Sequence, residues 1–265
     1  MFDSYIVSNT KTSLSMPLAC PPPRKLKHSK GFKDFKGFTL AETLITLTII
    51  GVVAALTVPN LLNKYTKHTY VVGLKKAYSQ LQNAIKMIPI TEGCSGGDYD
   101  CAGMFEEPGK ATNIDGMVFG GNEAYKATYL LSKQFKTQEI IFGFTNDKCV
   151  ENTRGRDKMP CFITNDGTIF GSYVNYTVVD INGSKGPNIV GRDIFEFQIA
   201  LENKNDIKQG TIIPTGSKLD EIYSGYSTAY WQNNNYCSTT NVNTKDDTNS
   251  RYCAGRVLEE DAMNY

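Results

Sequence analysis

The sequence predicts an α+β protein in which one long N-terminal α-helix packs against an antiparallel β-sheet stapled by disulfides. Three observations lead to this fold class. A 21-residue uncharged stretch, residues 43–63, continues into a segment with an apolar residue every three or four positions. Short runs of β-type residues follow between residues 139 and 213, and six of the seven cysteines lie beyond residue 90. At 265 residues, the chain has room for one large domain or two small ones.

The uncharged stretch has the length and composition of a membrane-spanning helix. A helix rises ~1.5 Å per residue, so the stretch spans about 30 Å, the thickness of a hydrocarbon core. A buried core helix is one alternative, but such helices are seldom apolar on every face. A signal peptide is another, but the residues after Pro59 contain no small-residue cleavage site. We therefore expect residues 38–63 to form the transmembrane half of a helix.

The same helix is expected to continue as an amphipathic half, residues 64–89. Its apolar stripe consists of Val71, Leu74, Tyr78, Leu81, Ile85 and Ile88. This spacing places all six side chains on one face, which can support an outer domain. Pro89 is expected to end the helix, which then runs from Phe38 to Ile88.

Residues 90–265 are expected to form an extracytoplasmic α+β globular domain. Short helices are predicted at residues 122–135 and 255–262. Strands are predicted at residues 139–144, 161–165, 168–174, 176–181, 193–201 and 211–213. The Asn-Asp-Gly sequence at residues 165–167 is a strong hairpin signal. The Tyr-, Ser-, Asn- and Thr-rich residues 224–252 are predicted to form a long loop.

The cysteines predict three disulfides. Cys20 stands apart, and the other six, Cys94, Cys101, Cys149, Cys161, Cys237 and Cys253, follow the membrane span. An even number in an extracytoplasmic domain suggests disulfides. Several connectivities are open, and pairing between sequence neighbours is favoured because each pair closes a short polar loop, worth roughly 2.5–3 kcal/mol in the chain-entropy model. Zinc is the alternative, but no C-x-x-C occurs and His68 lies on the long helix.

The composition argues against an enzyme and against nucleic-acid binding. The only histidines are His28 and His68, and no P-loop or dinucleotide fingerprint occurs. Residues 1–37 carry seven basic and two acidic side chains, whereas the remainder carries 21 basic and 25 acidic ones. An acidic body does not favour phosphate neutralisation. The basic residues before the span place the N-terminus in the cytoplasm and the body outside.

Glu42 is a candidate functional residue because a carboxylate in a membrane span costs a few kcal/mol. The alternative is a glutamate at a helix start near the interface, where the helix dipole favours an anion. Its context is Lys-Gly-Phe-Thr-Leu-Ala-Glu at residues 36–42, followed by the apolar helix. A second Lys-Gly-Phe, at residues 30–32, has Lys36 where the first has its glutamate.

Over residues 31–62, this pattern resembles the processing motif of type IV prepilins and type II secretion pseudopilins. The resemblance implies that a prepilin peptidase/methyltransferase removes leader residues 1–37 by cutting between Gly37 and Phe38. The new amine of Phe38 would then be methylated, which keeps its charge. The leader is long for the family, and Met16 is an alternative start.

The resemblance also implies assembly roles for two residues. Glu42 would pair with the Phe38 amine of a neighbouring subunit, so that two costly charges compensate each other in the bilayer. Pro59 would mark a helix kink. The partners implied are other pilin or pseudopilin subunits, and the location is the bacterial inner membrane and then the fibre.

Two function classes follow from this reading. The first is a structural subunit of a type IV pilus or type II secretion pseudopilus, used for secretion or surface attachment. The second is a minor pilin that acts as an adhesin or DNA-uptake module. The Tyr- and Asn-rich segment 223–236 contains the only tryptophan, Trp231. It would form either a contact surface or a loop packed on its own domain.

A calcium loop is a further hypothesis for residues 180–193. Asp180, Asn182 and Ser184 alternate as oxygen donors, and Asp193 could return a carboxylate. The resemblance makes calcium relevant, because some pseudopilins hold it in a β-region loop. The alternative is a glycine-rich connection whose Asp and Asn side chains bond their own backbone, and two basic residues in the loop oppose a cation.

Overall fold

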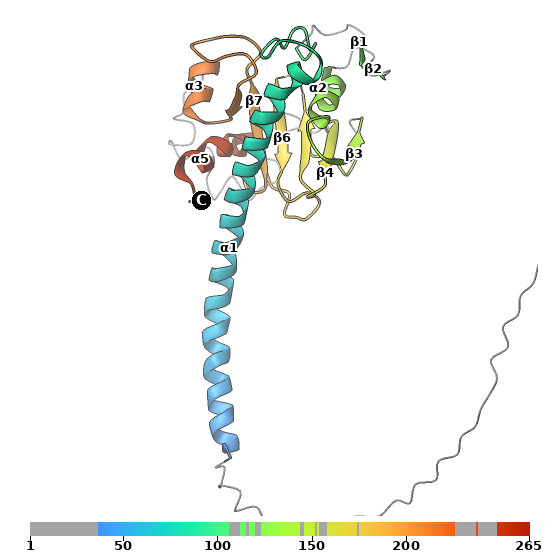
Figure 1. The fold of residues 1–265 in the computed structure, drawn as a ribbon. Coiled ribbons are helices and arrows are strands. Elements are labelled where there is room, and N and C mark those ends of the chain that lie inside the picture. Colours follow the sequence, from blue (N-terminus) through green and yellow to red (C-terminus); the bar gives the residue numbers. More distant parts are fainter. Residues whose placement is uncertain are drawn as a thin grey trace, which may run out of the picture. The chain divides into compact units, whose positions relative to one another are not determined.

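The computed structural model describes residues 37–105, 112–114, 117–119, 123–143, 146–151, 153, 158–173, 175–225, 237 and 248–265. The leader up to residue 36 and the aromatic segment with Trp231 lie outside these residues. The chain divides into two units, Met1–Val53 and Ala54–Tyr265. Helix α1 (Leu40–Thr91) contributes to both, and every other helix and strand that the structure describes belongs to the second unit (Figure 1).

The first part of α1 is long and apolar enough to cross a membrane, and none of its most apolar window is buried. The helix continues through Pro59. Threonine hydroxyls along this part donate to the carbonyls of their own helix: Thr43 to Leu40 at 2.9 Å, Thr46 to Thr43 at 2.9 Å and Thr48 to Leu44 at 2.7 Å. These polar groups therefore need no water, which suits a lipid environment.

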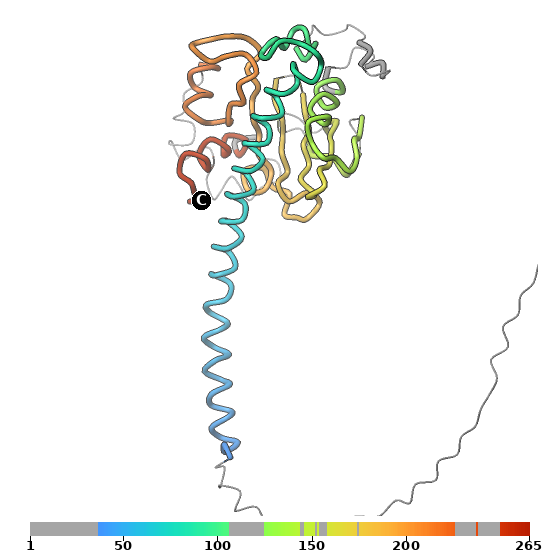
Figure 2. Tube along the Cα trace, in the orientation of Figure 1, coloured from blue at the N-terminus to red at the C-terminus, as the bar shows by residue number. Residues whose placement is uncertain are grey.

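The second part of α1 carries the core-facing stripe expected from the sequence. Leu74, Leu81, Ile85 and Ile88 are fully buried, and Val71 is nearly so. Each such side chain stabilises the fold by about 1.5–3 kcal/mol relative to an exposed one. Within the second unit, this part of α1 crosses the sheet, as the Cα trace shows (Figure 2).

Pro89 does not end α1, and the expected end at Ile88 is wrong, because the helix continues to Thr91. Proline removes only one backbone donor, and buried Pro89 still uses its carbonyl, which accepts from the Cys94 amide at 2.8 Å. The stop comes at Gly93, whose φ of 79° is a left-handed conformation that glycine adopts freely.

The sheet is a six-stranded antiparallel meander in the order β3-β4-β5-β6-β7-β8. Its strands are β3 (Thr137–Ile141), β4 (Cys161–Thr164), β5 (Ile169–Ser172), β6 (Tyr176–Asp180), β7 (Ile194–Ile199) and β8 (Ile212–Pro214). All six predicted strand segments are present, with shifted ends, and the Asn-Asp-Gly turn joins β4 to β5. A separate hairpin of β1 (Thr112–Ile114) and β2 (Met117–Phe119) was not expected.

Alternation along the strands divides the interior into two layers. Phe162, Phe170, Phe195 and Phe197 face α1 and are almost wholly buried. The residues between them on the same strands face a second cluster, which includes the disulfide of Cys161. Because both faces are covered, charged side chains on these strands are also buried.

Among the described residues, the second unit contains three further helices and one 3-10 turn. They are α2 (Glu123–Ser132), α3 (Lys218–Ser224), η1 (Thr248–Tyr252) and α5 (Cys253–Glu260). Helices α2 and α5 lie near the two predicted positions. Helix α3 was not predicted, although Ser217 accepts from the Asp220 amide as its N-cap and Gly225 closes it in a left-handed conformation.

The six cysteines form the three expected neighbour pairs, Cys94–Cys101, Cys149–Cys161 and Cys237–Cys253. Ion pairs also join α1, and the residue that follows it, to the rest of the second unit: Lys75 with Asp261, Lys76 with Asp166, and Glu92 with Lys133. The first two pairs are substantially exposed, so each contributes little on its own.

Candidate functional site

The start of α1 is organised by a capping box between Thr39 and Glu42. The Glu42 carboxylate oxygen Oε2 accepts the Thr39 backbone N–H at 2.9 Å and the Thr39 hydroxyl at 2.9 Å. In return, the Glu42 amide donates to the Thr39 hydroxyl oxygen at 3.2 Å. This Thr-x-x-Glu exchange satisfies backbone donors that a helix start leaves open. The pattern is visible in the sequence, but hydropathy alone presents Glu42 only as an anomaly.

The capping box leaves part of the carboxylate unused. Among the hydrogen bonds of the described residues, Glu42 accepts only through Oε2, so Oε1 faces no protein donor there. A carboxylate can accept through both oxygens. Glu42 is therefore held in place by its own helix and can still accept a cation from outside the subunit.

The cleavage junction is sterically open. Phe38 is 87% exposed, and a β-carbon added to Gly37 would meet no protein atom within 4 Å. Gly37 and Phe38 also precede the first helical residue. An accessible, non-helical segment can enter a protease site without unwinding a helix, which is compatible with the cut expected between the two residues.

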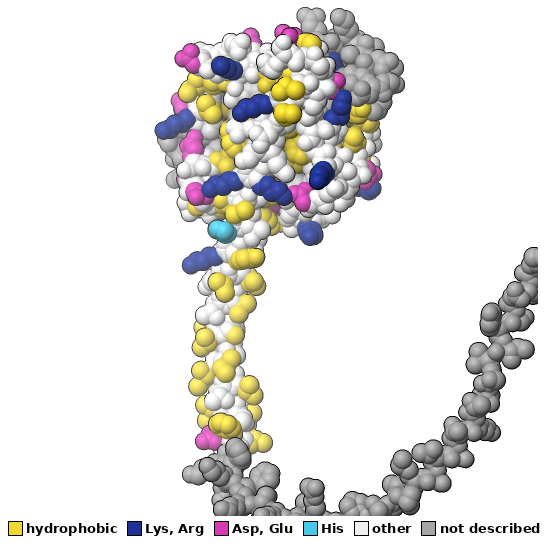
Figure 3. Space-filling view, in the orientation of Figure 1, with side chains coloured by type: hydrophobic (Ala, Val, Ile, Leu, Met, Phe, Trp, Pro, Cys, Tyr) yellow, Lys and Arg dark blue, Asp and Glu magenta, His cyan; other side chains and the backbone are white. Residues whose placement is uncertain are grey.

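The apolar half of α1 is a surface that the described part of the chain leaves almost uncovered. From Leu40 to Thr69, only Ala54 and Thr66 are even partly covered. Figure 3 shows hydrophobic side chains gathered along this part of the helix on the face drawn. An apolar surface of this length requires lipid or other helices around it.

The loop between β6 and β7 brings the predicted calcium residues together only in part. Asp193 uses both carboxylate oxygens to accept backbone N–H groups of the loop, from Asn188 at 2.8 Å and Ile189 at 2.7 Å. Asp180 accepts the Asn182 amide at 3.2 Å. The alternative of Asp and Asn side chains that bond their own backbone is therefore present.

Two observations nevertheless point to a polar ligand at this loop. The Asn182 oxygen Oδ1 is buried and makes no hydrogen bond in the described residues. Asp180 and Ser184 also line a cavity of about 370 Å³. Burial, followed by the nearby Asp193 carboxylate, raises the pKa of Asp180 to about 7, and burial also raises the pKa of Asp193. A cation would relieve both penalties.

The described residues contain no group of three or more His, Cys, Asp and Glu side chains suited to hold a metal ion. A calcium site here would therefore rely on amide, hydroxyl and backbone oxygens as well as carboxylates, which calcium accepts. A second cavity, lined by Lys86 and Lys208, was not anticipated, because its walls come from segments far apart in the sequence.

Comparison with known proteins identifies the N-terminal segment. Residues 28–58 match the family model of the prokaryotic N-terminal methylation motif, which includes Gly37, Phe38 and Glu42. No curated protein and no solved structure was found to be significantly similar to the chain. The match covers the leader end and the first part of α1, and it supports a structural subunit. Through this segment, the chain carries the signature of the type IV pilin and pseudopilin family.

Proposed function

We propose that the chain is a subunit of a type IV pilus or a type II secretion pseudopilus. It is cut before Phe38, methylated there, and polymerised from the inner membrane for secretion or surface attachment. The match at residues 28–58 carries this proposal. The exposed apolar half of α1 supports it, because such a surface can lie in lipid before assembly and against other helices afterwards.

The proposed assembly contact is an ion pair between subunits. The free oxygen of Glu42 would accept the methylated amine of Phe38 from a neighbour. In hydrocarbon, an unpaired charge is expensive, so a helix that slides out of register would lose this compensation. The pair therefore selects one axial position among the many that apolar side chains alone would permit.

Processing is tested by mass spectrometry of the mature protein. We expect an N-terminal peptide that begins at methylated Phe38. A mature protein that retains residues 1–37 would contradict the proposal. A bulky residue at Gly37 should leave the precursor uncut, whereas Gly51→Ala, a change within α1 away from the cut, should not affect cleavage.

Assembly is tested with Glu42→Val and the matched control Leu44→Val. Glu42→Val should insert normally, since it removes a charge from an apolar helix, but fibre yield should fall at least tenfold. Leu44 is 56% exposed on the same helix, and its variant should assemble like the parent. Normal fibres from Glu42→Val would refute the ion pair. Recovery of the subunit from sheared surface fibres would indicate a pilus, and recovery only from the cell envelope a pseudopilus.

We also propose that the β6–β7 loop binds calcium, with Asp180 and Asn182 as the central oxygen ligands. The buried, unpartnered oxygen of Asn182 is the observation that favours it. The test is thermal unfolding of the full chain in detergent, with and without millimolar calcium. At 100-fold above its dissociation constant, a bound ion adds about 2.7 kcal/mol.

The matched variants are Asp180→Asn and Asp206→Asn. Both remove one carboxylate, but Asp206 is exposed and lies outside the loop. Calcium should raise the melting temperature of the parent and of Asp206→Asn, and not that of Asp180→Asn. An unchanged parent melt in calcium would leave the loop as a plain connection.

A further inference from the structure

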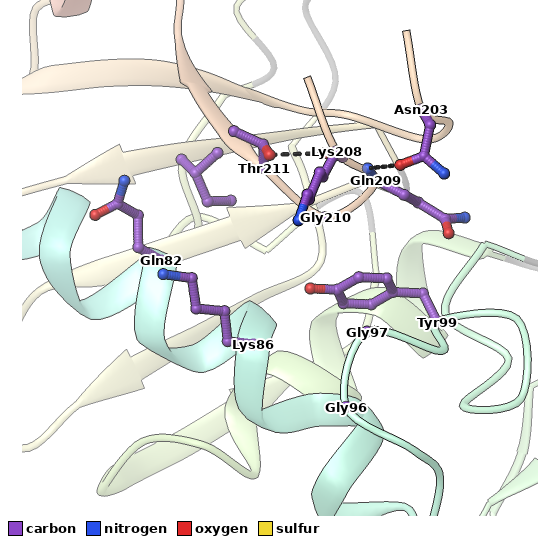
Figure 4. Close-up of a pocket in the computed structure, with 11 residues that line it drawn as sticks. Gln82, Lys86, Gly96, Gly97, Tyr99, Asn203, Lys208, Gln209, Gly210 and Thr211 are labelled. Carbon is purple, nitrogen blue, oxygen red and sulfur yellow. Dashed lines mark hydrogen bonds between the residues drawn. The ribbon is translucent and has the colours of Figure 1, made fainter. Parts of the chain in front are cut away.

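The cavity beside the C-terminal end of α1 has walls from three segments of the second unit. Helix α1 supplies Gln82 and Lys86, the loop closed by Cys94–Cys101 supplies Tyr99, and the segment before β8 supplies Asn203 and Lys208, among others (Figure 4). Its volume is about 520 Å³. Pockets for small ligands start at about 300 Å³, so this one can hold a molecule the size of a sugar.

The cavity wall is built from closely fitted parts. Gly210 has a φ of 77°, and a β-carbon there would lie 2.2 Å from the Tyr99 ring. The ring is thus seated directly against the backbone. The Gln209 side chain is held by the Leu201 carbonyl at 2.9 Å and by Asp100 at 3.4 Å. These contacts fix the wall before any ligand arrives.

The charge of the lining is one-sided. Its residues include two lysines, Lys86 and Lys208, and no carboxylate. Neither amine forms an ion pair within the described part of the chain. At two other cavities of the described residues, by contrast, a lining carboxylate is paired with a lysine: Asp166 with Lys76, and Glu151 with Lys158. Figure 4 shows the Lys208 amine and the Tyr99 hydroxyl directed into the space that Lys86 borders.

Neutral donors and acceptors surround the two amines. The Asn203 oxygen accepts the Gln209 amide at 2.9 Å, which leaves the Asn203 NH₂ group for a ligand. The Gln82 amide and the Tyr99 hydroxyl also make no hydrogen bond within the described residues. Burial raises the pKa of Tyr99, so its hydroxyl keeps its proton and can donate. Fixed amides and hydroxyls of this kind suit the hydroxyl groups of a sugar.

We propose that this cavity binds an acidic sugar, with Lys86 and Lys208 on its anionic group and Gln82, Tyr99 and Asn203 on its hydroxyls. The anionic group is a carboxylate or a phosphate, which two amines recognise alike as point charges. A concave site with one sign of charge concentrates such ligands near the surface. The inference stands on the second unit alone and does not depend on polymerisation.

The experiment measures ligand binding to the full chain in detergent by saturation-transfer NMR. The probes are glucuronate, glucose 6-phosphate, neutral glucose and inorganic phosphate. We expect binding of at least one acidic sugar, at least tenfold tighter than glucose and tighter than phosphate. Binding should weaken as salt is raised from 50 to 300 mM, in line with screening at roughly these concentrations. Glucuronate alone would identify a carboxylate site, and glucose 6-phosphate alone a phosphate site.

The variants locate the site. Lys86→Gln with Lys208→Gln should reduce binding at least tenfold, and arginine at both positions should restore it. Lys218→Gln changes an exposed lysine on α3 outside the cavity and controls for the loss of a single surface charge. The proposal is overturned if no probe binds at 10 mM, if glucose or inorganic phosphate binds as tightly as the acidic sugars, or if the double glutamine variant binds like the parent.

Discussion

The two halves of α1 are both apolar, yet only one of them takes part in a core. Before Tyr70, apolar side chains such as Leu47, at 66% exposed, are not buried by any described part of the chain. After it, Leu74 and Leu81 are fully buried against the sheet. Both halves are helical, so hydrophobic content alone does not decide burial. What differs is pattern: a stripe that faces one way fits a sheet, whereas an apolar surface all around fits lipid or a bundle of like helices.

The sharpest test of this contrast is a matched pair of leucine truncations on one helix. Leu81→Ala should lower the free energy of unfolding by about 2–5 kcal/mol, because it leaves a cavity in the core. Leu47→Ala should change it by less than about 0.5 kcal/mol, since no packing within the subunit is lost. Denaturant unfolding in detergent measures both. Equal losses would mean that the first half packs on its own subunit.

A second test uses a buried ionisable side chain in the second unit. The pKa of Asp180 is raised to about 7, so the folded state binds its proton more tightly than the unfolded state does. The contribution of Asp180 to the unfolding free energy should therefore be highest below about pH 4 and fall by about 4 kcal/mol as the pH rises to 7 without calcium. Asp180→Asn should remove this component from the pH profile. An identical profile in the variant would show that Asp180 ionises normally.

A third test removes one disulfide from the second unit. Replacing Cys149 and Cys161 by alanine opens a loop with a sequence separation of 12 residues. The loss should be about 3 kcal/mol in the chain-entropy model, with burial of both cysteines adding to it. A larger loss is expected when the parent is reduced with dithiothreitol, because reduction also opens Cys94–Cys101 and Cys237–Cys253. An unchanged unfolding free energy in the double alanine variant would contradict the stabilising role of this disulfide.

The smallest effect is expected at the start of α1. Thr39→Val keeps the shape of the side chain but removes the hydroxyl that exchanges hydrogen bonds with Glu42. Local helix stability should fall by about 1 kcal/mol, the usual cost of a lost cap. Hydrogen exchange of the first turn measures it, with Thr48→Val as the control inside the helix. Fibre yield should fall less than for Glu42→Val, because the carboxylate itself remains.

Periodicity made most of this fold predictable. The stripe from Val71 to Ile88, the alternating Phe195 and Phe197, and the Asn-Asp-Gly turn each carry a local signal that survives in the folded protein. The prediction that Pro89 ends α1 was wrong because the helix-breaking effect of proline describes average helices. Here, burial of the residue outweighs the loss of one backbone hydrogen-bond donor. Helix α3 was not predicted because it is short, although its capping residues Ser217 and Gly225 can be recognised in the sequence.

The candidate sites also differ in how far the sequence alone could predict them. Gly37, Phe38 and Glu42 are contiguous in sequence, so a linear pattern exposes them. The calcium residues are also close in sequence, but the chain alone does not show that Asp193 accepts two amides of its own loop. The cavity with Lys86 and Lys208 was invisible, because 122 positions separate the two lysines and only the fold brings them to one space.

The stripe on α1 also determines how the subunit would respond to mechanical load. From Tyr70 to Ile88 the buried contacts lie along the helix axis for about 28 Å, at ~1.5 Å per residue. A pull along that axis strains all of these contacts simultaneously, rather than opening them one after another from an end. The Lys75–Asp261 and Lys76–Asp166 pairs are loaded in parallel with them. A fibre built on such helices would thus transmit tension through its spine while the globular units remain attached.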